Sequence, residues 1–425
     1  MMRFTIALAA MIALLASHGA PFTGVPPAFG QGPYEAEPVL KASDFVAPDI
    51  LSGPHYTVDP RVPVTGLLAR FTIRSDYGTF VANGLHMLQI RVREVHAIAQ
   101  LDDMSKTKEF TDAAARAALR PVAAAANMAL NPVETIAGVP AGVTRLFDRV
   151  ELGARAIEGA ASTPDQSTSQ KAADVTERVG GITATALGYE KQRRDLAKGL
   201  GVDPYTTNPV LAKKLDDAAW VAFSGQFSVD AAISVFVPYS MAISSVTIID
   251  STIYDTPSAD LINSAQAVFA ATGASAAQVQ ALMQNKQYSV SLLAALARGV
   301  QRLQGVAGQP ALVAYAALAQ THDQGRFVTA AVNMLARHHE SVGPIARVSA
   351  PGPIVGHTAM GALIVPAPVD YVAWMQGIAR FAQRDDLRAP QRIAWLSGWL
   401  SRRASKEFAA RSWEVKQAFS IRAER

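Results

Sequence analysis

The feature that most constrains the fold is a series of apolar stripes with helical spacing between residues 257 and 339. Each stretch carries apolar residues three and four positions apart, which is typical of a helix with one buried face. Short turns separate the stretches, and helices joined by short loops pack as antiparallel neighbours. The predicted helices cover residues 276–285, 289–304, 310–320 and 326–339.

Helical spacing extends through much of the remaining chain. An apolar stripe from Leu85 to about Leu101 predicts one long helix, whose polar face carries Arg91, Arg93 and Glu94. The high alanine content also favours helices. Further helices are predicted at residues 106–130 with a bend near Pro121, 171–200, 210–223, 371–383 and 391–419.

Two parts of the chain show strand patterns instead. Residues 70–74 and 79–81 alternate polar and apolar side chains around a turn at residues 75–78, which predicts a β-hairpin. Residues 346–349 and 361–365 also indicate strands, and we expect them to pair with the hairpin in one small sheet. The predicted fold class is therefore mainly α: a helical bundle with small antiparallel β elements near both ends of the mature chain.

The chain begins with a pattern typical of a secretory signal peptide. Arg3 precedes an apolar run from Phe4 to Ala16, which is shorter than a membrane-spanning helix needs. Residues 1–19 are expected to be removed, and an uncleaved anchor is the alternative. Residues 20–55, rich in Pro and Gly, indicate a flexible linker, and residues 56–425 a single mainly helical domain. The expected location is periplasmic or secreted.

Composition and charge limit the chemistry that the chain can perform. Because there is no cysteine, disulfides, thiolate metal sites and a cysteine nucleophile are excluded. The formal net charge is +4, and the segment from Arg380 onward holds eleven basic and five acidic residues. The rest of the chain is therefore close to neutral, whereas a nucleic-acid-binding protein is usually more basic. No nucleic-acid partner is expected.

Two segments of low charge raise the possibility of a membrane-active protein. Residues 231–249 contain no charged residue and approach the length of a membrane span. Serine, threonine and proline interrupt the run, which favours a buried helix followed by a buried strand. Residues 119–147 are rich in Ala, Gly and Pro and are also low in charge. A buried core explains both segments with fewer assumptions than insertion into a bilayer does.

The histidine and acidic residues near residues 322–340 are the best candidates for a metal site, since imidazole and carboxylate suit zinc or iron. Ligands on one helix face lie three or four positions apart, and adjacent histidines point in different directions. We therefore predict no metal site. Solvated helix ends are the preferred interpretation, with the two adjacent histidines near a helix C-terminus. The candidates are His322, Asp323, His338, His339 and Glu340.

No motif specifies a catalytic site. The Gly-x-Ser-x-Gly pattern of α/β hydrolases is absent. Residues 352–358 contain glycines without a phosphate-binding lysine, which indicates a connection between strands. His357 suits acid–base chemistry but has no carboxylate nearby in the sequence. Asp370 precedes Tyr371 and Trp374, a pattern that favours an N-cap followed by core aromatic residues.

The predicted terminal helix combines aromatic and basic side chains, which can place a helix at an anionic membrane surface. A packed helix with a solvated basic face is the preferred interpretation. The residues concerned are Trp395, Trp399, Phe408 and Trp413 with Arg402, Arg403, Lys406 and Arg411.

Three segments carry a resemblance to a known group of proteins. The first, residues 131–147, begins with Asn-Pro-Val-Glu-Thr, continues with spaced Gly, Pro and Val residues and ends with Leu-Phe. The second, residues 201–209, reads Gly-Val-Asp-Pro-Tyr-Thr-Thr-Asn-Pro. The third, residues 368–374, reads Pro-Val-Asp-Tyr-Val-Ala-Trp. In these segments the chain resembles an uncharacterised family of exported bacterial proteins. The resemblance implies export but no activity, cofactor or catalytic residue.

The sequence thus favours a non-catalytic binding or envelope-associated protein outside the cytoplasm. One alternative is an exported enzyme whose site is assembled from distant residues such as His357 and Asp370. The other is a membrane-active protein. No catalytic residue, cofactor or metal ligand is predicted, and the expected partner is a protein or an anionic membrane surface.

Overall fold

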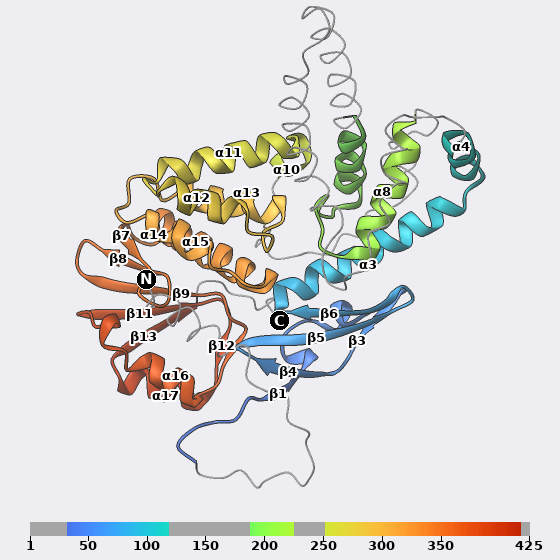
Figure 1. The fold of residues 1–425 in the computed structure, drawn as a ribbon. Coiled ribbons are helices and arrows are strands. Elements are labelled where there is room, and N and C mark those ends of the chain that lie inside the picture. The colour runs from blue at the N-terminus through green and yellow to red at the C-terminus, as the bar shows by residue number, and fades with distance from the viewer. Residues whose placement is uncertain (1–31, 119–187, 225–250, 418–425) are drawn as a thin grey trace, which may run out of the picture.

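The computed structural model describes residues 32–118, 188–224 and 251–417 (Figure 1). Within these residues the strands form three sheets of six, five and two strands. The expectation of a mainly helical bundle with small β elements is therefore wrong: helices and sheets both contribute to the cores, and the larger sheets lie in the N-terminal and C-terminal parts of the chain.

The N-terminal sheet is antiparallel and has the order β1-β4-β5-β3-β2, with β6 paired to β5. The predicted hairpin is confirmed, since β5 and β6 pair from Arg70 with Asn83 to Ser75 with Gly78. Alternate residues of β5, among them Phe71 and Ile73, are buried against the long helix that follows. The elements are β1 (Val39–Lys41), η2 (Ala42–Asp44), α2 (Pro48–Leu51), β2 (Ser52–Gly53), β3 (Tyr56–Val58), β4 (Arg61–Thr65), β5 (Leu68–Ser75) and β6 (Gly78–Asn83).

Several of these elements lie in residues 20–55, the segment expected to be a flexible linker. Residues 32–38 also contact the C-terminal part of the chain. The backbone N–H of Glu35 donates to the carbonyl of Trp374 at 2.8 Å, and its carboxylate accepts a hydrogen bond from Ser401 Oγ at 2.6 Å. The guanidinium of Arg403 donates to the carbonyls of Gly32 and Pro33. This segment therefore connects the N-terminal sheet to the C-terminal part of the protein.

The helix predicted from Leu85 is α3 (Leu85–Lys106), one turn longer than the apolar stripe indicated. It is followed by α4 (Lys108–Ala118). A helical segment at residues 188–200 and α8 (Pro209–Phe223) pack on α3 in a separate apolar core. Asn208 caps α8 by accepting from the backbone N–H groups of Val210 and Leu211.

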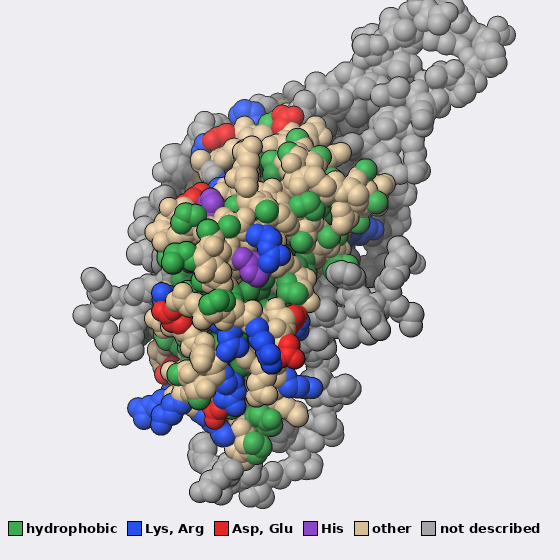
Figure 2. All heavy atoms as spheres, turned by 90° about the vertical axis from the view of Figure 1, so that its left-hand side faces the viewer, with side chains coloured by type: hydrophobic (Ala, Val, Ile, Leu, Met, Phe, Trp, Pro, Cys, Tyr) green, Lys and Arg blue, Asp and Glu red, His purple; other side chains and the backbone are tan. Residues whose placement is uncertain are grey.

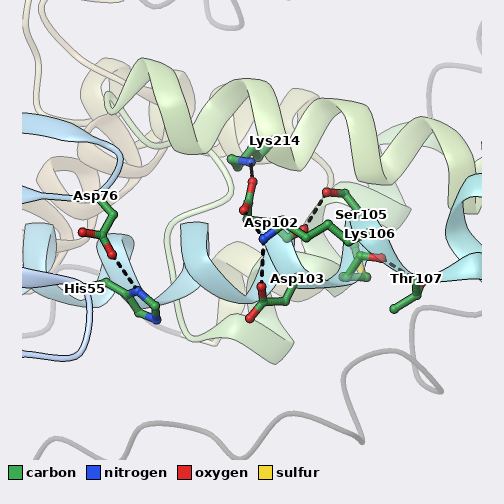
Figure 3. A network of polar contacts seen from close by, with 9 residues as sticks. His55, Asp76, Asp102, Asp103, Ser105, Lys106, Thr107 and Lys214 are labelled. Carbon is green, nitrogen blue, oxygen red and sulfur yellow. Dashed lines mark hydrogen bonds and ion pairs between the residues drawn. The ribbon is translucent and has the colours of Figure 1, made fainter.

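An ion-pair network fixes α8 to the C-terminal end of α3. Figure 3 shows Asp102 of α3 between two lysines, with 2.5 Å to Lys214 Nζ and 2.8 Å to Lys106 Nζ. The lysines lower the pKa of Asp102, through hydrogen bonds from Lys106 first and Lys214 second. His55 and Asp76 form a separate pair at 3.1 Å. The network has a structural role, since its charges are neutralised by one another.

Replacing Lys214 by methionine is expected to lower the free energy of unfolding by about 1 kcal/mol, because Lys214 is half-buried beside Asp102. The matched control is Lys213→Met, which removes a lysine from the exposed side of α8, where it pairs with Asp217. Urea unfolding of both variants, followed by tryptophan fluorescence, measures the difference. Equal midpoints for the two variants would contradict a stabilising role for the Lys214 contact.

The predicted series of helices is confirmed and forms a helical layer. Serine and threonine cap several of its helices, as with Ser289, whose Oγ accepts from the backbone N–H of Leu292. The helices are α10 (Thr252–Asp255), α11 (Ser258–Ala271), α12 (Ala276–Met283), α13 (Val290–Gln301), α14 (Pro310–Ala316) and α15 (His322–Ser341). Leu296 of α13 and Leu335 of α15 share one apolar core with Ile364 and Trp395 of the C-terminal sheet.

The C-terminal sheet is mixed, with the order β13-β11-β9-β8-β7. β9, β11 and β13 are parallel, and two short helices connect them on the face opposite the helical layer (Figure 1). The elements are β7 (Ile345–Ser349), β8 (Val355–Thr358), β9 (Ala362–Ala367), α16 (Gln376–Ala382), η3 (Asp385–Leu387), β11 (Gln391–Leu396), α17 (Arg402–Ala410) and β13 (Trp413–Gln417). β10 (Tyr371–Val372) and β12 (Trp399–Leu400) form the two-stranded parallel sheet.

Two expectations for this part of the chain are wrong. The predicted long helix over residues 391–419 is instead β11, β12, α17 and β13, because the segment forms strands of a parallel sheet with a crossover helix between them. The strands at residues 345–349 and 362–367 do not pair with the hairpin at residues 68–83. They belong to a separate sheet, in which β8 lies between them.

The aromatic and basic residues of the C-terminal part of the chain lie in different environments. Trp395, Phe408 and Trp413 are buried in the cores on either side of the C-terminal sheet. Lys and Arg side chains gather on the lower half of the face shown in Figure 2, where hydrophobic side chains are scattered. Three of the four aromatic residues that the membrane interpretation assigned to this region are therefore buried, and Trp399 is half-buried.

Several expectations fall outside the described residues: the signal peptide at residues 1–19, the low-charge segments at residues 119–147 and 231–249, and the start of the helix expected from residue 171. Among the helices that the structure does describe, none is both long and apolar enough to cross a bilayer.

Candidate functional site

The N-terminal ends of two long helices, α3 and α15, meet near the middle of the molecule (Figure 1). Asn83, just before α3, donates from Nδ2 to Asp323 Oδ2 in the first turn of α15 at 2.8 Å. Asp370, after β9, accepts hydrogen bonds from the backbone N–H groups of Leu85 at 3.2 Å and Ala69 at 2.8 Å. Since helix N-termini carry partial positive charge, this junction favours negatively charged groups.

Arg326 extends from the second turn of α15 and is the most unusual residue at this junction. No group among the described residues forms a hydrogen bond or an ion pair with its guanidinium. Burial, followed by the nearby charge of Arg91, lowers the pKa of Arg326 to about 10. The side chain is half-buried, and none of its nitrogens is both buried and unpaired, so the guanidinium reaches solvent. A charge enclosed in this way without a partner is costly to the folded state.

Burial and the positive charge of Arg326 lower the pKa of two nearby histidines. His86, in the first turn of α3, has a buried Nε2 atom without a hydrogen-bond partner in the described structure. Burial, followed by the charges of Arg326 and Arg93, lowers the pKa of His86 to about 3. Burial and Arg326 also lower the pKa of His322, the first residue of α15. Both rings are therefore neutral near pH 7.

Arg93 completes the group on α3. It lies seven positions after His86, which places the two side chains on the same helix face. Burial lowers the pKa of Arg93, and within the described part of the chain its guanidinium has no hydrogen-bonding partner. We call the four residues His86, Arg93, His322 and Arg326 the basic centre.

A buried polar network holds the neighbouring part of α3 in place. Glu94 is 2% exposed and accepts hydrogen bonds from Asn208 Nδ2 at 3.1 Å and from Thr206 Oγ1. Arg91 pairs with Glu94 at 2.5 Å and donates to Thr207 Oγ1 at 3.1 Å. The charge of Arg91 is therefore neutralised by Glu94. The two arginines of the basic centre have no such carboxylate partner among the described residues.

The loop at residues 201–208 supplies Thr206 and Asn208 as partners of Glu94 and is itself anchored to the helical layer. Asp203 accepts hydrogen bonds from the backbone N–H of Tyr205 at 2.8 Å and from Ser291 Oγ at 2.5 Å. Burial raises the pKa of Asp203 despite these hydrogen bonds. Tyr205 donates from its hydroxyl to Glu190 at 2.8 Å. The loop thus couples α3 to the helical layer.

The arrangement has the properties of an anion-binding site. Two guanidinium groups without partners among the described residues, in the second turn of α15 and the third turn of α3, act on His86, and the neighbouring imidazoles are neutral. An anion would provide the counter-charge that Arg326 and Arg93 lack. Hydrogen bonds between an arginine and an anion are charge-assisted and are stronger than hydrogen bonds between neutral groups. A metal site is a poorer fit: within residues 32–118, 188–224 and 251–417, no three His, Asp or Glu side chains are placed to hold a metal ion.

The residues considered for a metal site divide between the two ends of α15. His322 and Asp323 lie in its first turn, whereas His338, His339 and Glu340 lie in its last, about 24 Å away at 1.5 Å per residue. Asp323 does not cap the helix, since Thr321 accepts from the backbone N–H of Gln324. Only His322 and Asp323 belong to the junction described above.

The two adjacent histidines have structural contacts rather than solvated positions. The His338 ring contacts the Trp395 ring edge-on at 5.0 Å, and its Nδ1 lies 3.0 Å from the carbonyl of Gly343. His339 Nδ1 accepts a hydrogen bond from the backbone N–H of Ile345 at 3.0 Å. These contacts join the end of α15 to the start of β7. Glu340 pairs with Arg302 of the loop after α13.

His357 and Asp370, the pair considered for a catalytic site, have different partners. His357 lies in strand β8, so the connection expected over residues 352–358 is in part a strand, and its Nε2 lies 3.0 Å from Ser349 Oγ on the neighbouring strand β7. Asp370 binds the backbone amides of Ala69 and Leu85 instead. The expectation that Asp370 is an N-cap residue is therefore wrong: Met375 is the N-cap of α16, and Gly84 is the N-cap of α3, whose first backbone N–H donates to Asp370.

Sequence reasoning missed three of the four residues of the basic centre: His86, Arg93 and Arg326. It placed Arg93 on the polar face of a helix, where solvation is the usual outcome. A basic residue at the start of each of two predicted helices was the available signal, but it becomes informative only when the two helix ends are known to meet.

Comparison with models of known protein families, with curated proteins and with solved structures finds no match to this chain. The resemblance to exported bacterial proteins therefore stays a prediction. Two of its three segments border the junction: residues 201–209 contact Glu94, and residues 368–374 contain Asp370.

Proposed function

We propose that this protein is a non-catalytic binding protein that holds a small anionic ligand at the basic centre. The observation that carries the proposal is Arg326, an enclosed guanidinium that reaches solvent and has no partner among the described residues. Such a group destabilises the folded state unless a ligand supplies the counter-charge. If residues 1–19 direct export, as we expect, the ligand is bound outside the cytoplasm.

The neighbouring residues support binding over catalysis. His86 is neutral and inaccessible at Nε2, so it is poorly suited to transfer a proton. Glu94 accepts hydrogen bonds from Thr206 and Asn208, which fix the helix that carries His86 and Arg93. Cations without a partner among the described residues, held in the second turn of α15 and the third turn of α3, are preorganised for an anion, and preorganisation lowers the entropic cost of binding.

The variant Arg326→Gln tests this function. Because hydrogen bonds to charged groups contribute about 1.5–3 kcal/mol, we expect it to weaken anion binding roughly tenfold to a hundredfold. Isothermal titration calorimetry with phosphate, sulfate, acetate and citrate, in a buffer of low ionic strength, measures the affinity. Glutamine keeps an amide donor, removes the charge and shortens the side chain.

The control for non-specific attraction is Arg380→Gln, which removes one positive charge from the exposed surface of α16. This variant should bind as the wild-type protein does. The proposal fails if the wild-type protein binds none of the four anions at millimolar concentrations. It also fails if Arg326→Gln and Arg380→Gln weaken binding equally, because the attraction would then be a property of the net charge.

A further inference from the structure

The hydrogen bond made by His322 fixes which of its ring nitrogens carries the proton. His322 Nδ1 lies 2.9 Å from the backbone carbonyl oxygen of Gln287. A carbonyl oxygen only accepts, so Nδ1 is the donor in this contact. In the neutral ring Nε2 is then unprotonated and presents a lone pair.

The Nε2 atom of His322 is also available to a ligand. The ring is half-buried, no group among the described residues forms a hydrogen bond with Nε2, and Nε2 is not one of the buried unpaired atoms. Arg326 lies four positions later on α15, so the two side chains share one helix face. The site therefore offers a cationic donor and a neutral acceptor side by side.

This combination of a cationic donor and a neutral acceptor restricts which ligands the site can bind. An anion that presents only bare oxygens would satisfy Arg326 but would face the lone pair of His322. A ligand with an ammonium group would satisfy His322 but would be repelled by Arg326 and Arg93. An anion with a hydroxyl group next to its charged oxygens satisfies both, because the hydroxyl donates to Nε2.

We infer that the ligand of the basic centre is an anion with an O–H donor adjacent to its charge, such as a hydroxy acid or a singly protonated phosphate. This inference rests on the proposed function and adds the chemical class of the ligand. Arg326 binds the charged oxygens, His322 accepts from the hydroxyl, and Gln287 keeps the ring in the tautomer that can accept.

Two pairs of probes test the inference, each differing mainly in the hydroxyl group. Glycolate is compared with acetate, and hydrogen phosphate with sulfate, by isothermal titration calorimetry of the full chain near neutral pH. Since a hydrogen bond contributes about 1 kcal/mol net, we expect roughly a fivefold preference for the hydroxylated member. A preference in the first pair alone identifies a hydroxy acid, and in the second alone a phosphate.

Two substitutions assign the preference to His322. In His322→Asn the side-chain amide can replace Nδ1–H as the donor to Gln287, but the acceptor at Nε2 is lost, so the preference for the hydroxylated member of each pair should disappear. In His322→Gln the amide oxygen can reach the position of Nε2, and the preference should return. Thermal unfolding of both variants checks that they fold.

The outcomes separate the inference from the proposed function. Equal affinities within both pairs, in a wild-type protein that binds all four anions through Arg326, would overturn the inference and leave the anion-binding function intact. A preference that persists in His322→Asn would also overturn it, since another group would then accept the hydroxyl. Absence of any anion binding would overturn the proposed function itself.

Discussion

Replacing Glu94 by alanine is expected to lower the free energy of unfolding by about 3–5 kcal/mol. The carboxylate is buried and accepts hydrogen bonds from Arg91, Thr206 and Asn208. Alanine removes the acceptor, so the Arg91 charge and two polar side chains remain in the interior without their partner. Urea unfolding followed by tryptophan fluorescence measures the loss.

Asp103→Ala is the matched control, because Asp103 lies on the same helix and pairs with Lys106 on the surface. Its removal should change the unfolding midpoint little. Glu94→Gln should fall between the two variants, since glutamine keeps one acceptor but not the charge. If Glu94→Ala were no more destabilising than Asp103→Ala, the network around Glu94 would not be what holds residues 201–209 against α3.

The elements that the sequence predicts well are those that depend on local patterns. The β5–β6 hairpin follows from alternating side chains around a four-residue turn, and α3 from an apolar stripe of helical period. The helices between residues 276 and 341 follow for the same reason. In each case the residues that define the element are near one another in the sequence, so no knowledge of tertiary contacts is required.

The C-terminal sheet shows where such patterns fail. β11 is a short apolar run, and a strand buried on both faces shows no alternation that would distinguish it from a helix. Its neighbours β9 and β13 are brought beside it by α16 and α17, which appeared in the sequence as parts of longer helices. Parallel pairing depends on contacts between distant segments, and single-sequence periodicity does not record them.

The basic centre was hidden for a related reason. Arg326 and Arg93 occupy ordinary positions in amphipathic helices, and only the meeting of α3 with α15 encloses their charges. His322 was recognised as a candidate, but for metal binding and with partners that lie at the opposite end of its helix. The chemistry of each residue was visible in the sequence, whereas its neighbours were set by tertiary structure.

The carboxyl group of Asp370 is expected to make the protein less stable as the pH rises from about 4 to about 6. Burial raises the pKa of Asp370 from 3.8 to about 6, and the amides of Ala69 and Leu85 offset only part of this effect. Between these values the folded protein retains a proton that the unfolded chain releases, so a rise in pH favours the unfolded chain. The stabilising contribution is complete below pH 3.8 and is lost as the pH passes 6, with a magnitude of up to about 3 kcal/mol.

Two substitutions at Asp370 separate its charge from its hydrogen bonds. Asp370→Asn keeps an oxygen where Oδ2 accepts from the amides of Ala69 and Leu85 and removes the titration, so its stability near neutral pH should equal or exceed that of the wild type. Asp370→Ala leaves both amides unpaired and should lower the free energy of unfolding by about 2–3 kcal/mol. Urea unfolding across this pH range measures both effects. Because other carboxylates titrate in the same range, the decisive quantity is the difference in unfolding free energy between the wild type and Asp370→Asn. A difference that does not vary with pH would show that Asp370 is not the group that titrates.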